Sequence, residues 1–243
     1  MGVLPVDVHP SEVGLDATRL GRVADFARAF VDDGHMVGTD VLVARHGRVV
    51  LRSTSGLADR ENSVPVADDT LWRIFSMTKP ITSVAVMQLV EEGRLRLRDP
   101  VSGVLPEFAD PRVFVGGTAD VPEVVPADRP ITIADLLSHT SGLSYSILDQ
   151  HPVDEMYRRA GLAALERGGT LADTISRLAA LPLRHQPGTR WSYSMATDVL
   201  GRVVDHYDEG ALLKFYGSVA ADCDGASAPF KDCFTNKLRK AFA

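Results

Sequence analysis

The chain has 243 residues, of which 45% are hydrophobic, and its formal net charge is -6. This length and composition predict one globular domain, with or without a subdomain, and the negative charge argues against a nucleic-acid partner. No apolar run approaches the roughly 20 residues of a membrane span, and the N-terminus lacks the basic and apolar regions of a secretory signal, so we expect a cytoplasmic protein without a membrane partner.

The first part of the chain predicts a helix followed by a β-hairpin. Asp16 is a helix N-cap residue, and apolar side chains recur after it at helical spacing. Two β-rich runs, 39–45 and 48–54, flank a turn at His46. A helix followed by a hairpin is typical of an α+β layer. Residues 57–70 are polar and are expected to form a connecting loop.

The segment Ser76-Met-Thr-Lys79 precedes an apolar helical pattern over residues 81–90. If the helix begins near Ser76, a spacing of three places Ser76 and Lys79 on one face, one turn apart. A serine hydroxyl needs a base or a cation within hydrogen-bond reach to act as a nucleophile, and a lysine at this spacing can serve. Taken alone, the tetrapeptide favours the ordinary interpretation, a surface N-cap serine beside a solvated lysine.

The middle of the chain predicts less regular structure. Residues 94–101 read as an extended segment, and the proline-rich residues 105–130 as a long surface loop. Thr132 and Asp135 have the spacing of a capping box and indicate a short helix. His139 follows that helix, and a histidine that organises a loop is favoured there over a catalytic one.

Helical patterns resume at residues 153–166 and 171–181. The chain contains no phosphate-binding Gly-rich loop, no Gly-x-Ser-x-Gly elbow and no close histidine pair, so we expect neither a cofactor nor a metal. The two cysteines, Cys223 and Cys233, match no zinc or redox spacing and are expected to be free thiols.

Four segments of the chain together resemble the serine β-lactamase-related family. They are Phe75-Ser-Met-Thr-Lys79, Leu95-Arg-Leu-Arg-Asp-Pro-Val101, Leu136-Leu-Ser-His-Thr-Ser-Gly-Leu143 and Pro187-Gly-Thr-Arg-Trp-Ser-Tyr193. Within the family the chain looks most like the family VIII carboxylesterases and the class C β-lactamase-like esterases and acyltransferases. The resemblance implies an α+β fold of the β-lactamase/transpeptidase type, with an N-terminal helix and hairpin of a central antiparallel sheet and a helical subdomain.

The resemblance also implies three catalytic residues. Ser76 would be the nucleophile that accepts the acyl group, Lys79 its partner, and Tyr193 the residue that shuttles the proton. An unperturbed tyrosine pKa near 10 makes a poor base, but a neighbouring ammonium group favours the phenolate. Which of Tyr193 and Lys79 takes the proton first stays open, because a coupled pair titrates as a unit.

The sequence departs from the family in two places. Met195 stands where β-lactamases and penicillin-binding proteins commonly have an asparagine, and a thioether lacks the donors and acceptor of an amide. This favours ester over amide substrates. The resemblance also stops after Val204, without the third family motif and most of the C-terminal strands of the sheet. We therefore expect three parts, residues 1–75, 76–204 and an atypical tail 205–243, as in a truncated or frameshifted chain.

The sequence thus predicts a serine hydrolase that acts on small esters through a Ser76 acyl-enzyme, with an acyltransferase as a variant of the same chemistry. The alternatives are a β-lactamase or D-amino-acid peptidase, and a non-catalytic fragment without a finished site.

Overall fold

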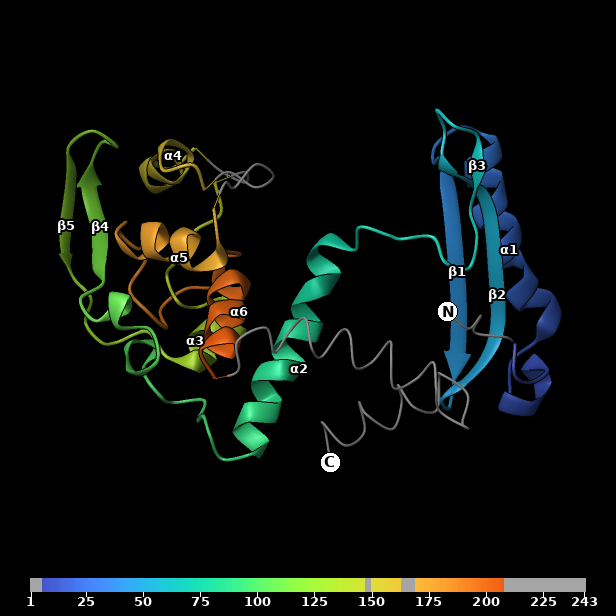
Figure 1. The fold of residues 1–243 in the computed structure, drawn as a ribbon, viewed down its shortest axis with the longest axis horizontal. Helices are drawn as coiled ribbons and strands as arrows, with labels where there is room; N and C mark the ends of the chain where they lie inside the picture. Colours follow the sequence, from blue (N-terminus) through green and yellow to red (C-terminus); the bar gives the residue numbers. More distant parts are fainter. Residues whose placement is uncertain (1–5, 147–149, 163–168, 208–243) are drawn as a thin grey trace. The chain divides into compact units, whose positions relative to one another are not determined.

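The computed structural model describes residues 6–146, 150–162 and 169–207. These residues divide into two compact units, 6–74 and 75–207, which are described separately (Figure 1). The predicted tail and both cysteines fall mostly or wholly outside the described residues, so the division at residue 205 stays a prediction. None of the helices in the described ranges has the length and apolar character of a membrane span, and the expected cytoplasmic location also stays a prediction.

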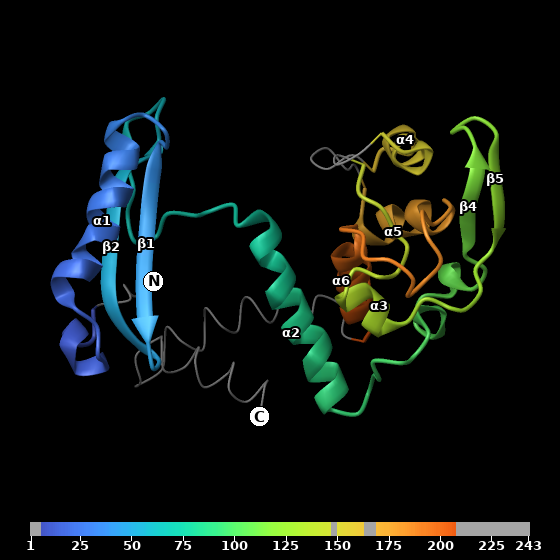
Figure 2. The same cartoon turned by 180° about the vertical axis from the view of Figure 1, so that it is seen from behind.

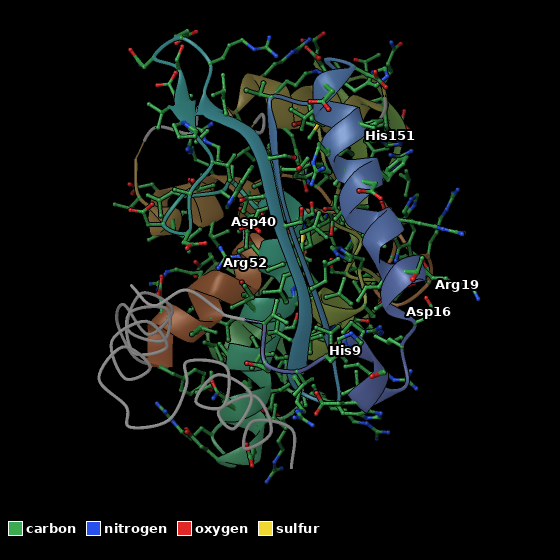
Figure 3. The ribbon with its side chains drawn as sticks, turned by 90° about the vertical axis from the view of Figure 1, so that its right-hand side faces the viewer. His9, Asp16, Arg19, Asp40, Arg52 and His151 are labelled. Atoms are coloured by element: carbon green, nitrogen blue, oxygen red, sulfur yellow. The ribbon has the colours of Figure 1, made fainter. Side chains whose placement is uncertain are left out.

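The unit 6–74 is a helix packed on a small antiparallel sheet, with the strands in the order β1-β2-β3. Its elements are η1 (Pro10–Val13), α1 (Ala17–Asp32), β1 (Gly38–Arg45), β2 (Arg48–Asp59) and β3 (Val64–Pro65). The predicted cap is confirmed, because the Asp16 side chain accepts a hydrogen bond of 2.8 Å from the backbone N–H of Arg19 at the start of α1 (Figure 3).

The predicted hairpin is also confirmed. His46 and Gly47 both have positive φ angles, 52° and 72°, as a two-residue hairpin turn with the twist of its strands requires. The predicted loop over 57–70 is partly wrong, because β2 continues to Asp59 and pairs with β3. A side-chain turn makes this possible: Asp59 accepts a hydrogen bond from the backbone N–H of Asn62 and reverses the chain.

The unit 75–207 contains most of the helices. Its elements are η2 (Phe75–Met77), α2 (Thr78–Glu91), η3 (Val101–Gly103), η4 (Pro106–Phe108), β4 (Arg112–Gly117), β5 (Pro122–Pro126), α3 (Ile133–Leu137), α4 (Pro152–Arg159), α5 (Leu171–Ala179) and α6 (Ala196–Tyr207). Helix α6 packs against α2, α3 and α5, as the view from behind also shows (Figure 2). Apolar side chains from these helices form one continuous core.

Two predictions for this unit are wrong. Residues 105–130 contain the β4–β5 hairpin instead of a loop without secondary structure. The prolines allow this because Pro122 and Pro126 bound β5 in a two-stranded sheet, where each has an edge available. Residues 94–101 form turns, and only Pro100 makes a β-bridge, to Thr132. The predicted capping box of α3 and the helices near 153 and 171 are confirmed.

Both units combine helices with antiparallel strands, so the α+β prediction is confirmed.

Candidate active site

Ser76 lies in η2, directly before helix α2, and its side chain is exposed. The preceding residue, Phe75, has a left-handed backbone with φ 43°, which is uncommon for a bulky residue. Lys79 lies in the first turn of α2 and is partly buried. Its Nζ donates a long hydrogen bond of 3.4 Å to Ser76 Oγ. Ser76 and Lys79 therefore lie on the same face at the start of α2, as their spacing predicts.

Tyr193 comes from a loop far along the chain, just before α6. Its hydroxyl lies 2.6 Å from Ser76 Oγ, and Lys79 Nζ lies 4.7 Å from the centroid of its ring. The structure thus brings together the three residues that the sequence singled out, Ser76, Lys79 and Tyr193.

The electrostatics of this group act on the tyrosine. Partial burial would raise the pKa of Tyr193, but hydrogen bonds with Lys79 and Ser76 and the positive charge of Lys79 outweigh burial and lower this pKa. Asp198 acts in the opposite direction. The net shift favours the phenolate, which can accept a proton from a hydroxyl at 2.6 Å.

His139 lies beside Tyr193. The sequence did not predict this position, because it favoured a histidine that organises a loop. Its ring centroid is 5.0 Å from that of Tyr193 and 6.4 Å from that of Trp191. Its backbone is left-handed, with φ 56°. Burial, and then the charge of Lys79, lower the pKa of the imidazole and favour its neutral form.

An ion pair between the buried Asp135 and the exposed Arg129 holds the His139 loop in place. Asp135 accepts two hydrogen bonds from Arg129, of 2.7 and 2.8 Å, and one of 3.1 Å from the Thr140 hydroxyl. The Thr140 carbonyl in turn accepts the N–H of Gly188 at 2.7 Å. A side chain at Gly142 would overlap the carbonyl oxygen of His185, so this close approach of two backbone segments requires glycine there.

A second buried group supports the same loop. Ser144 donates a short hydrogen bond to the fully buried Asp154, and its backbone N–H donates to the hydroxyl of Tyr157. The next residue, Tyr145, places its ring edge-on to Tyr193, at 5.6 Å between centroids. No sequence signal identified Tyr145, because its contact with the site depends on the tertiary fold.

Three apolar side chains close in sequence to Ser76 or Tyr193 are exposed. Phe75, Met77 and Trp191 are all exposed, with relative accessibilities of 68%, 72% and 64%. Met195, by contrast, is fully buried in the core. The position that often carries an asparagine in the resembled family therefore presents no polar side chain here.

Within the described ranges, no three His, Cys, Asp or Glu side chains gather closely enough to hold a metal ion.

Comparisons with known proteins agree with the motifs. A family model described as Beta-lactamase matches residues 23–218. Esterase EstB of Burkholderia gladioli is 42% identical over 202 residues, which are 82% of this chain and 48% of that protein. A lovastatin esterase of Penicillium rubens is 35% identical over 193 residues, covering 77% of this chain and 47% of that protein.

Among solved structures, EstCE1, a hydrolase with promiscuous acyltransferase activity, has a TM-score of 0.69 and 34% identity, covering 82% of this chain and 50% of that one. This similarity confirms the predicted fold type. The chain spans about half the length of the curated relatives that it matches.

Proposed function

The chain belongs to the beta-lactamase family, and on that premise we propose that it is a serine hydrolase of the carboxylesterase type that forms an acyl-enzyme on Ser76. One observation carries this proposal: Ser76 Oγ lies 2.6 Å from the hydroxyl of Tyr193, with Lys79 Nζ 3.4 Å from the same oxygen. A serine becomes a useful nucleophile when a base and a cation lie this close.

The proposed reaction moves one proton at each half-step. The Ser76 proton passes to the phenolate oxygen of Tyr193 while Oγ attacks the ester carbonyl carbon. The alcohol then leaves with that proton, and an acyl-enzyme remains. A water molecule repeats the sequence, releases the acid and restores Ser76. The shorter of the two distances favours Tyr193 over Lys79 as the first proton acceptor.

The proposed substrate is a small ester with an apolar acyl or alcohol group. The exposed side chains of Phe75, Met77 and Trp191 offer apolar contacts near the nucleophile. The buried Met195 supports an ester substrate over an amide substrate. An amide N–H of the substrate would require a hydrogen-bond acceptor, which this residue does not supply. The names of two relatives, both esterases, point the same way.

Intact-mass measurement of the purified chain after reaction with a fluorophosphonate tests the proposal. We expect one covalent adduct, and we expect Ser76→Ala to abolish it, because the probe bonds only to an activated oxygen. With short p-nitrophenyl esters, Ser76→Ala should lower the rate by about 10³-fold or more. Ser83→Ala, a change of the same type further along α2, is the matched control and should keep both activities.

The alternatives give different results in the same assays. Faster turnover of nitrocefin than of p-nitrophenyl esters would point to a β-lactamase. A chain that melts cooperatively by circular dichroism but forms no adduct would contradict the hydrolase proposal and favour a non-catalytic role.

A further inference from the structure

His139 holds the chain on both sides of Tyr193. Its backbone carbonyl accepts the N–H of Ser192 at 2.8 Å, and its ring Nδ1 lies 3.1 Å from the hydroxyl of Ser194. Its ring also lies tilted against that of Tyr193, with 5.0 Å between the ring centroids and 31° between the ring planes. One residue therefore contacts Tyr193 and both of its neighbours in the chain.

The contact with Ser194 ties the imidazole to a buried residue. Ser194 is buried, and its Oγ accepts the N–H of Ala196 at 3.3 Å. The same Oγ lies 3.1 Å from Nδ1 of His139, and either group can be the donor, depending on the tautomer. Burial and the charge of Lys79 lower the pKa of the imidazole and favour its neutral form.

The place of His139 is itself fixed by the fold. The left-handed backbone at φ 56° is disfavoured in a residue with a side chain, so the surroundings must hold it. The next residue, Thr140, is hydrogen-bonded both to the buried Asp135 and to the backbone of Gly188. His139 thus lies between the hydrogen-bonded Thr140 and its own contacts around Tyr193.

We propose that His139 is a positioning residue for acyl transfer, and that its contacts with the chain on both sides of Tyr193 hold the Tyr193 hydroxyl against Ser76. This inference rests on the proposed function and deepens it. His139 does not touch the reacting oxygen, so it acts through Tyr193. Losing the contact would let the tyrosine ring move, and a displacement of about 1 Å in such a group can cost about 10²-fold in rate.

Three variants separate the parts of this contact. His139→Asn keeps a side-chain acceptor and tolerates left-handed backbone, His139→Phe keeps only a ring, and His139→Ala keeps neither. The matched control is His46→Ala, because His46 is also left-handed, at φ 52°, but lies in the β1–β2 turn. It carries a similar backbone change in the unit 6–74, outside the unit that supplies Tyr193.

Two measurements are made on each variant of the full chain that melts cooperatively. The first is the second-order rate of fluorophosphonate addition to Ser76. The second is the titration of Tyr193, followed by tyrosinate absorbance as the difference from Tyr193→Phe. We expect His139→Ala and His139→Phe to lower the rate about tenfold or more and to move the pKa of Tyr193 up toward its ordinary value near 10. His139→Asn should recover part of both, and His46→Ala should change neither.

The outcomes separate the inference from the proposed function. If the His139 variants lose thermal stability while the rate and the Tyr193 titration stay at wild-type values, His139 is merely structural and the inference is wrong. If the wild-type chain forms no adduct, the proposed function fails, and the titration alone decides the role of His139. Should His139→Ala not fold, Ser194→Ala removes the same hydrogen bond from the other side and is expected to shift the titration in the same direction.

Discussion

The two units of the chain differ in how much apolar surface they bury. In the unit 6–74 the buried cluster consists of Val8, Val13 and Val50, with a few partly buried neighbours. In the unit 75–207 one continuous core extends from α2 to α6 and includes fully buried aromatic and aliphatic side chains such as Tyr157 and Leu178. Large apolar side chains on α1 and β1 stay exposed, among them Phe26 and Leu42.

The difference in buried apolar surface implies that the more stable unit is also the one that contains the candidate site. Apolar burial contributes about 25 cal/mol per Å² of area removed from water, so the unit 75–207 is expected to be the more stable of the two. The same unit supplies Ser76, Lys79, His139 and Tyr193. The candidate site therefore rests on the better packed part of the chain.

The largest expected effect comes from a pair of matched leucines. Leu178→Ala, in α5, removes a fully buried side chain and should cost about 2–5 kcal/mol. Leu42→Ala, in β1, removes a side chain that is 43% exposed and should cost less than about 1 kcal/mol. Tryptophan fluorescence during urea unfolding can report on each unit, because Trp72 lies in one unit and Trp191 in the other. Equal losses for the two variants would contradict the comparison.

A smaller effect is expected at Asp135, and it depends on pH. Burial would raise the pKa of this carboxyl, but hydrogen bonds from Arg129 and Thr132 lower it from 3.8 to about 2. Because the folded-state pKa lies below the unfolded one, the contribution is present above about pH 4 and is lost as the pH falls through 2.

At neutral pH this contribution amounts to about 2 kcal/mol. Asp135→Asn should lower the free energy of unfolding by that amount at pH 7 and by much less near pH 2, as measured by urea titration at both values. Asp110→Asn changes a carboxylate that is 82% exposed and is the control. A loss that is the same at both pH values would show that Asp135 does not act through its charge.

The smallest effect is expected at Phe26 on α1. Its ring is 69% exposed and, among the residues that the structure describes, stacks on Phe30 at 5.7 Å, so Phe26→Ala should change stability by no more than about 0.5 kcal/mol. A large loss at Phe26, measured in the same urea titrations, would mean that the α1 surface is covered in solution.

The local parts of the fold could be predicted from the sequence. The Asp16 cap, the His46-Gly47 turn and the capping box at Thr132 each depend on residues close together in the chain. The β4–β5 hairpin was missed because prolines were read as loop signals, whereas in a two-stranded sheet they stand at the ends of a strand.

The residues of the candidate site also differ in whether local sequence could predict them. Ser76 and Lys79 could be found from their spacing, because a helical turn brings them together. Tyr193 needed the family resemblance, since its contact with Ser76 spans most of the unit. His139 was read as a residue that organises its loop, and its contacts on both sides of Tyr193 exist only in the folded chain.

Selection for heat resistance would act directly on the left-handed backbone at Phe75, next to Ser76. A glycine at this position would relieve the steric conflict and make the folded chain more stable. It would also remove the exposed apolar ring beside Ser76 and let the serine sample other orientations. Directed evolution for robustness and directed evolution for turnover are therefore expected to favour different residues at this one position.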